Sequence, residues 1–451
     1  MEDYVQKILR ARVYDVAIET PLERAKNLSA RLGNNIFLKR EDLQPVFSFK
    51  IRGAYNRMRQ LTKQQLQKGV IASSAGNHAQ GVALSASYLK CKSLIVMPVT
   101  TPLTKVLAVR ALKAKVILHG DSYDESYHEA LRISKEQGLT FIHPFDDPEV
   151  IAGQGTIAME ILRQCEKPPD KIYVAVGGGG LISGVSAYVK TLWPNVEIIG
   201  VEPSDSSAMT QSLQAGKIIE LNELGLFADG VAVKKVGKNT FEISQKYVDS
   251  MVTVNTDEIC AAIKDVFEDT RSILEPAGAL AIAGLKAHVS KNNLKNLDLI
   301  AIACGANMNF ERLRFVAERA ELGEKREAML AIEIPEKAGS LKRICKLLGK
   351  KNLTEFSYRM SEGDSAYIFM GVEVANSIDR EDLINNLKSA GIKCLDLSQD
   401  ELSKVHLRHM VGGRLPKATK TISGNKIKEL LYRFEFPEKP GALMRFLNSM
   451  R

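Results

Sequence analysis

The sequence predicts an α/β protein in which helices cover a parallel sheet, with a smaller α+β region towards the C-terminal end. Two observations lead to this prediction. From about residue 66 to residue 310, short runs rich in β-branched residues alternate with longer stretches of helical period. After residue 328, two similar segments each predict a strand, a turn and a helix, which indicates a duplicated module.

Length and composition narrow the class of protein. The chain has 451 residues, so two or three domains are expected. Its formal charge of +9 comes from scattered Lys and Arg residues without a block of like charge, and we expect no nucleic-acid partner. No apolar run approaches the roughly twenty residues that span a bilayer, and the first residues lack the apolar core of a signal peptide. We therefore expect a cytoplasmic protein with no membrane partner.

Cysteine and histidine spacing argues against disulfides and metal sites. The six cysteines lie far apart, and no two have the two-residue spacing of metal or redox sites, so reduced thiols are expected. The seven histidines form no cluster of ligands, and we expect no bound metal.

Strands and helices alternate in order along the first two thirds of the chain. Strands are predicted within residues 69–74, 93–98, 115–120, 171–180, 196–203 and 297–307. Helices are predicted at residues 78–89, 103–112, 124–137, 151–165, 181–192 and 310–320. In open sheets of this kind, ligands bind beyond the carboxyl ends of the strands.

The duplicated module lies within residues 329–349 and 429–450, where "EIPEKAGSLKR" matches "EFPEKPGALMR" without gaps. The first copy continues with further β-like runs and a second helix, which predicts a βαββαβ unit. The second copy stops after its first helix at Arg451. Either the chain is truncated, or its second module is incomplete by design. We therefore expect a domain at residues 1–324, a first module at 325–410 and the start of a second module at 411–451.

Lys50 lies in "VFSFKIRGAYNRM" (46–58), directly after the apolar residues Val46, Phe47 and Phe49. Lysine is almost never fully buried unless it is paired, so an apolar flank requires a reason. A surface lysine with a buried aliphatic stem is the ordinary alternative.

Four consecutive glycines, Gly177 to Gly180, separate a predicted strand from a helix. Without Cβ atoms, several backbone N–H groups can converge on an anion at a helix N-terminus, and phosphate is the natural ligand. A dinucleotide fingerprint needs a glycine where Ser183 stands, and Gly184 comes one position too late. No G-x-x-x-x-G-K-[ST] string for a nucleotide triphosphate occurs. The alternative is a glycine run that only lets helix and strand pack closely.

Two other strand ends carry polar residues. In "IASSAGNHAQG" (71–81), side chains that can donate hydrogen bonds gather at the start of a helix: Ser73, Ser74, Asn77 and His78. They could bind a ligand there, or they could serve only to cap the helix. In "IACGANMN" (302–309), Cys304 ends a strand, and alone it would be a buried small hydrophobe. Together with Lys50 and the glycines, these corners indicate a cofactor with a phosphate, an aldehyde that needs a lysine, and a ring nitrogen. Pyridoxal 5′-phosphate has these groups.

Seven longer strings carry a closer resemblance: "SFKIRGAYNRM", "SSAGNHAQGVA", "VIAGQGTIAMEIL", "VGGGGLISG", "GLFADGVAVK", "EPAGALAIAG" and "GANMNFERLRFVAERAELGE". In order and spacing they resemble the biosynthetic threonine deaminases (threonine ammonia-lyases or dehydratases), which are fold-type II pyridoxal-phosphate enzymes of the tryptophan synthase β family. The resemblance covers nearly the whole chain. It implies two open twisted sheets flanked by helices, followed by ACT-like regulatory modules.

The resemblance also implies roles for matching residues. Lys50 would bind the cofactor aldehyde and act as general base, with an amine pKa that its apolar flank lowers. Cys304 would face the ring nitrogen, and Glu275 would lie near the ring. Asn77 would hydrogen-bond the ring hydroxyl. The phosphate would be held by Gly177, Gly178, Gly179, Gly180 and the amide of Leu181. The substrate carboxylate would be received by Ser74, Asn77 and His78.

The activity implied is deamination of L-threonine to 2-oxobutanoate and ammonia, the first step of isoleucine biosynthesis, with some activity on L-serine. The resemblance also implies a homotetramer that isoleucine inhibits, with valine opposing the inhibition. The alternative is that the modules only stabilise the oligomer. In related serine racemases a serine stands where this chain has Ala75, so racemisation is not expected. The remaining alternatives are a β-replacement or serine-specific lyase, a non-catalytic amino-acid sensor and a nicotinamide dinucleotide enzyme.

Overall fold

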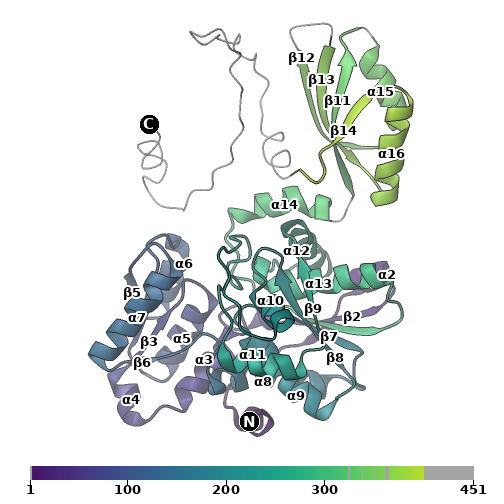
Figure 1. The fold of residues 1–451 in the computed structure, drawn as a ribbon. Coiled ribbons are helices and arrows are strands. Elements are labelled where there is room, and N and C mark those ends of the chain that lie inside the picture. Colours follow the sequence, from purple (N-terminus) through teal and green to yellow (C-terminus); the bar gives the residue numbers. More distant parts are fainter. Residues whose placement is uncertain (1–2, 324–325, 338, 350, 361–364, 401–451) are drawn as a thin grey trace, which may run out of the picture. The chain divides into compact units, whose positions relative to one another are not determined.

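The structure is a computed structural model that describes residues 3–400, except residues 324–325, 338, 350 and 361–364 (Figure 1). The described residues form two compact units, of which the first ends at Ala317 and the second begins at Glu318. The predicted second module at 411–451 lies outside the described residues.

A parallel four-stranded sheet in the first unit has the order β5-β4-β3-β6. Its strands are β3 (Val70–Ser73), β4 (Ser93–Met97), β5 (Lys115–Leu118) and β6 (Thr140–Phe141). The helices around it are α3 (Lys50–Arg59), α4 (Lys63–Lys68), α5 (Asn77–Tyr88), α6 (Leu103–Ala111) and α7 (Tyr123–Gln137). Alternate strand residues face opposite sides, so Ile95 packs with α3, α5 and α6, whereas Leu94 and Val96 pack against α7.

A six-stranded sheet in the same unit has the order β1-β2-β10-β7-β8-β9, and only β1 is antiparallel. Its strands are β1 (Leu22–Arg24), β2 (Asn35–Lys39), β7 (Lys171–Ala175), β8 (Glu197–Pro203), β9 (Ser250–Val254) and β10 (Asp298–Ile302). Around it lie α1 (Tyr4–Arg10), α2 (Lys26–Leu32), the short helix η1 (Glu41–Leu43), α8 (Pro148–Gln164), α9 (Gly180–Leu192), α10 (Ala208–Ala215), α11 (Lys238–Tyr247), α12 (Thr256–Thr270) and α13 (Pro276–Asn292). The next helix, α14 (Arg312–Gly323), contains the boundary between the two units. The chain before residue 66 thus supplies two strands that the sequence pattern did not assign.

The second unit has the predicted βαββαβ order: β11 (Glu327–Pro335), α15 (Ser340–Leu348), β12 (Leu353–Met360), β13 (Ser365–Glu373), α16 (Ser377–Ser389) and β14 (Lys393–Asp396). Its antiparallel sheet has the order β12-β13-β11-β14. Leu348 of α15 and Leu387 of α16 share one apolar core with Ile332 and Ile368 of the sheet. The helices therefore stabilise the sheet by covering one apolar face.

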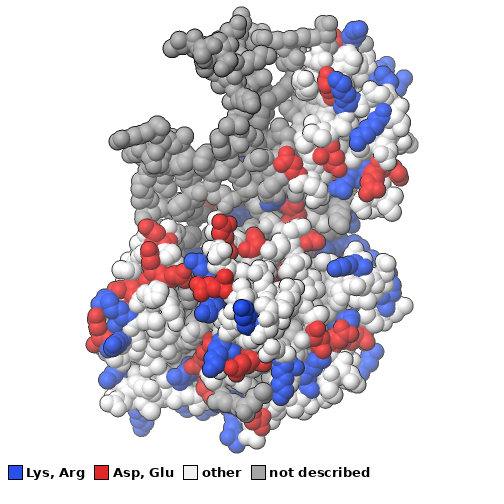
Figure 2. All heavy atoms as spheres, in the orientation of Figure 1, with Lys and Arg blue, Asp and Glu red and all other residues white. Residues whose placement is uncertain are grey.

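Positive charge does not collect on the face shown in Figure 2, where Lys and Arg side chains are interspersed with Asp and Glu. Across the described residues, no helix combines the length and the apolar character needed to cross a membrane. The same residues contain no group of three His, Cys, Asp or Glu side chains arranged to hold a metal ion.

Candidate active site

A cavity of about 270 Å³ lies where β3, β7 and β10 end. Residues from the loops after these strands line it, as expected for ligand sites in open α/β sheets. The structure brings every predicted site residue to this cavity: Lys50, Ser74, Asn77, His78, Gly177, Gly178, Gly179, Gly180, Leu181, Glu275 and Cys304.

Lys50 is the first residue of α3, and backbone contacts hold its loop against the turn after β10. The N–H of Phe49 donates to the carbonyl oxygen of Cys304 over 3.2 Å, and Ser48 forms an antiparallel bridge with Gly305. The Lys50 ammonium donates to the carbonyl oxygen of Pro144 over 2.9 Å. The side chain therefore points into the cavity and does not extend along the surface.

Burial in the cavity lowers the pKa of Lys50 from 10.5 to about 8, while the nearby Cys304 has a smaller opposing effect. The predicted apolar flank explains only part of this burial. Phe47 is 56% exposed, and Val46 packs in a separate cluster with Val13 and Ile51. Phe49 alone of the three flanking residues lies beside the amine, with its ring centroid 5.4 Å from Nζ. The cavity as a whole, more than the adjacent sequence, removes water from Lys50.

The glycine loop joins β7 to α9, with Gly179 as the N-cap in the left-handed region at φ +96°. A Cβ atom on Gly178 would overlap the ring of Phe145, and one on Gly177 would lie 2.9 Å from the carbonyl oxygen of Val231. Close packing thus requires glycine here. In the described part of the chain, the backbone N–H groups of residues 178–181 have no protein acceptor, so they are available to an anion at the helix N-terminus.

The loop after β3 presents a second helix N-terminus. Gly76 caps α5 without a side-chain bond, and the Ser74 hydroxyl accepts from its N–H over 3.2 Å. The Asn77 amide donates to Glu275 Oε1 over 2.5 Å and accepts from Asn307 over 2.7 Å. Asn307 also donates to the carbonyl oxygen of Val46. Asn307 thereby fixes which way the Asn77 amide points. No local sequence pattern predicts this role, although Asn307 lies in the "GANMN" string.

Two further groups in the cavity have shifted pKa values. Burial, helped by Asp229, raises the pKa of Glu275 to about 7, against the hydrogen bond from Asn77. Burial, helped by Lys50, lowers the pKa of His78 to about 3. His78 is therefore neutral at pH 7, with Nε2 2.8 Å from the carbonyl oxygen of Ile142. Its ring cannot act as a cation towards a carboxylate, which leaves its backbone N–H for that role.

Cys304 follows β10 and is buried. Burial, with Glu41 and Glu275 as further causes, raises the pKa of its thiol. Its Sγ donates to the carbonyl oxygen of Ile302 over 3.3 Å. The thiol is therefore neutral at pH 7.

The groups around the cavity fit pyridoxal phosphate. Lys50 supplies an amine for the aldehyde, and the glycine loop offers unpaired N–H groups for the phosphate. Several buried side-chain atoms of the described residues have no hydrogen-bond partner, and two of them belong to residues that line the cavity: Ser73 Oγ and His78 Nδ1. Such unpaired polar atoms are costly in a packed interior and are expected where a polar ligand binds.

Comparison with known proteins agrees with this geometry. Residues 13–305 match the family model of pyridoxal-phosphate dependent enzymes, and residues 318–407 match the C-terminal regulatory domain of threonine dehydratase. A biosynthetic L-threonine dehydratase from Burkholderia multivorans is 58% identical, over 99% of this chain and 87% of the relative. A biosynthetic L-threonine dehydratase from Escherichia coli is 49% identical, over 99% of this chain and 86% of the relative.

Solved structures lead to the same family. A processed threonine deaminase isoform from Solanum lycopersicum is 53% identical, with a TM-score of 0.69 over 70% of this chain and 92% of that chain. A maize serine racemase is 32% identical, with a TM-score of 0.66 over 69% of this chain and 96% of that chain. This chain is a member of the pyridoxal-phosphate dependent enzyme family and, within it, of the biosynthetic threonine dehydratases.

Proposed function

We propose that the chain deaminates L-threonine to 2-oxobutanoate and ammonia with pyridoxal phosphate in the cavity, and that it also acts more slowly on L-serine. The observation that carries this proposal is the convergence of an amine of lowered pKa, two helix N-termini and a neutral thiol on one cavity. The similarity to threonine dehydratases over nearly the whole chain supports the choice of threonine.

The cavity offers a holding group for each part of the cofactor. The N–H groups of Gly177 to Gly180 and Leu181 would bind the phosphate at the start of α9. Asn77, which Asn307 and Glu275 orient, would donate to the ring hydroxyl. Cys304 would face the ring nitrogen. The substrate carboxylate would lie at the start of α5, against Ser74 and the amides of Asn77 and His78.

Lys50 would carry the proton transfers. When bound, pyridoxal phosphate supplies a conjugated ring that accepts the charge left when the substrate Cα loses its proton. Lys50 takes that proton, and its lowered pKa of about 8 increases the fraction of neutral amine near pH 7. The neutral Cys304 thiol would give the ring nitrogen no anionic partner, which would favour early loss of the β-hydroxyl. The proton taken from Cα and the hydroxide that leaves together make one water. Hydrolysis then takes up one water, so L-threonine yields one 2-oxobutanoate and one ammonia.

The second unit would regulate this activity. We infer that isoleucine inhibits and valine opposes the inhibition, as for a committed first step of isoleucine biosynthesis, in a cytoplasmic homotetramer. The match of residues 318–407 to a regulatory domain supports regulation. We assign residues 1–324 to the catalytic domain, 325–410 to a first regulatory module and 411–451 to the start of a second. Initial rates with isoleucine, with valine and with both amino acids test the regulatory part, which fails if none changes the rate.

The catalytic proposal is tested on the purified full chain. We expect a visible cofactor absorption band, and borohydride reduction should attach the cofactor to the peptide that contains Lys50. Lys50→Ala should abolish release of ketoacid from threonine, whereas Lys63→Ala, at an exposed position on α4, should not. Unchanged deamination by Lys50→Ala would show that the assignment of Lys50 is wrong. Faster turnover of serine than of threonine would favour a serine-specific lyase. A protein that binds a nicotinamide dinucleotide and lacks the cofactor absorption band would instead be a nicotinamide dinucleotide enzyme.

A further inference from the structure

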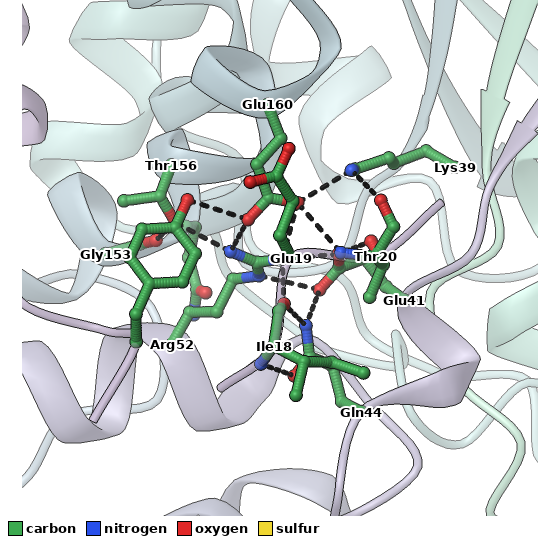
Figure 3. Close-up of polar contacts among 12 residues, drawn as sticks. Ile18, Glu19, Thr20, Lys39, Glu41, Gln44, Arg52, Gly153, Thr156 and Glu160 are labelled. Carbon is green, nitrogen blue, oxygen red and sulfur yellow. Dashed lines mark hydrogen bonds and ion pairs between the residues drawn. The ribbon is translucent and has the colours of Figure 1, made fainter. Parts of the chain in front are cut away.

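Next to the Lys50 cavity, four charged side chains are completely buried: Lys39, Glu41, Arg52 and Glu160 (Figure 3). We call them the buried charge cluster. Two are cations and two are anions, so the cluster is neutral as a whole. It has no part in the proposed chemistry, and none of its members lines the cavity.

Arg52 is the centre of the cluster. Its Nε and Nη2 donate to the two oxygens of Glu41 over 2.8 and 2.7 Å. Its Nη1 and Nη2 donate to the two oxygens of Glu160 over 2.6 and 3.0 Å. Further bonds to Thr156 and to the carbonyl oxygen of Ile18 complete its contacts. A planar guanidinium held by two bidentate pairs has one fixed orientation.

Lys39 closes the cluster on the other side. Its ammonium lies 2.6 Å from Glu160 Oε2 and donates to the carbonyl oxygen of Thr20 over 2.6 Å and to Gln164 over 2.9 Å. The hydroxyl of Thr20 in turn donates to Glu41 over 2.6 Å. Each charge in the cluster is thus paired and hydrogen-bonded, as burial requires.

The cluster connects the two chain segments that carry Lys50 and Cys304. Arg52 lies in the first turn of α3, which begins at Lys50. Lys39 ends β2, and its carbonyl oxygen accepts from the N–H of Ala303, the residue before Cys304. The carbonyl oxygen of Ala303 then accepts from the N–H of Asp42, next to Glu41. Arg52 therefore connects the start of α3 to the backbone that sets the position of Cys304.

Stability alone does not account for such a cluster. Removing four charges from water is costly, and an apolar core of similar volume is often as stable or more stable. Apolar packing, however, tolerates small shifts between helices and strands. Paired bidentate hydrogen bonds allow only one relative position of the elements that carry the charged residues.

We propose that the buried charge cluster is a positioning device that fixes Lys50 relative to Cys304, with Arg52 as its principal positioning residue. This inference rests on the proposed function, because it assigns the two residues to opposite parts of one bound cofactor. It also gives a reason for an arginine in the "SFKIRG" string, two positions after the lysine.

The test compares Arg52→Lys with Arg57→Lys in the full-length holoenzyme. Lysine keeps the charge of Arg52 but cannot form two bidentate pairs with the carboxylates of Glu41 and Glu160. Arg57 lies on the same helix and pairs with Asp147 over 2.8 Å, at a side chain that is 25% exposed, so it is a matched control outside the cluster. For Arg52→Lys we expect kcat to fall and the Kd of pyridoxal phosphate to rise, each by about tenfold or more, because small displacements of reacting groups are costly.

Two readouts separate positioning from general loss of structure. The thermal midpoint reports folding, and the pH at which the bound-cofactor absorption band changes reports the surroundings of Lys50. If Arg52→Lys does not fold, the double variant Arg52→Met with Glu41→Gln replaces it, because it removes one charge of each sign and leaves Lys39 paired with Glu160. A folded variant with altered cofactor affinity and a shifted band supports the proposal.

The proposal is overturned if a folded Arg52 variant has the same cofactor affinity, the same pH dependence of the cofactor absorption band and the same kcat as Arg57→Lys. The wild-type chain is measured first in every assay. If the wild type neither binds pyridoxal phosphate nor deaminates threonine, the proposed function fails. If the wild type does both and the Arg52 variants match the control, only the positioning role fails.

Discussion

The N–H of Phe49 donates to the carbonyl oxygen of Cys304, although the two residues lie far apart in the sequence of the first unit. Because Lys50 follows Phe49 directly, the amine and the thiol are attached to one small hydrogen-bonded patch of backbone. The bridge between Ser48 and Gly305 belongs to the same patch. A cofactor that contacts both residues therefore meets two groups whose separation the backbone sets before it binds.

Lys50 should be unusually reactive in the cofactor-free full chain. With its pKa near 8, about one amine in ten is neutral at pH 7, against fewer than one in a thousand for an ordinary lysine. We expect its acylation rate to rise with pH and to level off above about pH 8, while that of the exposed Lys63 keeps rising. Peptide mass spectrometry after short labelling pulses measures both rates. A Lys50 rate that still rises at pH 10 would contradict the lowered pKa.

His78 should make stability depend on pH. Its pKa is about 3 in the folded chain and about 6.5 when unfolded. Between these values the unfolded chain binds a proton that the folded chain does not, so the free energy of unfolding decreases as pH falls from about 6.5 towards 3. His78→Gln, which keeps a donor for Ile142, should remove up to about 1.4 kcal/mol of this loss per pH unit.

Urea unfolding at pH 6.5, 5.5 and 4.5 measures the His78 effect. The matched control is His128→Gln, which removes an exposed histidine from α7. His143 also has a lowered pKa, near 4, because it is buried, so only the difference between variant and wild type reports His78. Equal pH slopes for His78→Gln and the wild type would show that the ring is not buried as a neutral group.

The three strand ends that form the site were predictable because their signals are local. A β-branched strand followed by glycines or by small polar residues predicts a strand, a loop and a helix N-terminus, and the parallel order brings such ends to one edge. The structure confirms this arrangement for Gly177, Asn77 and Cys304. Their roles towards a ligand came from the family resemblance and remain proposals.

The features of the fold and site that the sequence does not predict depend on contacts between distant segments. "NIFLK" is too short to reveal that it pairs with β10, so the sequence did not indicate that Lys39 is buried beside Glu160. The pattern also could not show that Phe47 turns outwards at a positive φ of 55° while Phe49 turns towards the amine. Burial of a charge is decided by its partners, which no local pattern contains.

Gly178→Ala should weaken cofactor binding. The new methyl group would overlap the ring of Phe145, and overpacking of this kind costs about 1 to 3 kcal/mol. The loop must then move its N–H groups, so we expect the Kd of pyridoxal phosphate to rise about tenfold or more. Fluorescence titration of the cofactor measures the change.

Phe145→Ala in the same chain tests the steric cause of that loss. It removes the ring that the new methyl group meets, so the double variant should bind the cofactor more tightly than Gly178→Ala alone. If the double variant is no better, the alanine acts through the backbone conformation of the loop and not through Phe145.

Ala75→Ser should introduce racemisation. Ala75 lines the cavity directly after Ser74, and its methyl group cannot donate a proton to the substrate. A hydroxyl at this position would provide a second proton donor besides Lys50, and the family resemblance places it on the opposite face of the substrate. We expect the variant to form D-serine from L-serine at a rate above the wild type, together with ketoacid, as measured by chiral chromatography. Ala75→Gly also alters the loop at this position but adds no hydroxyl, and it should form no D-serine. Equal D-serine formation by both variants would mean that a change in the loop, and not the hydroxyl proton, controls which face of the substrate is protonated.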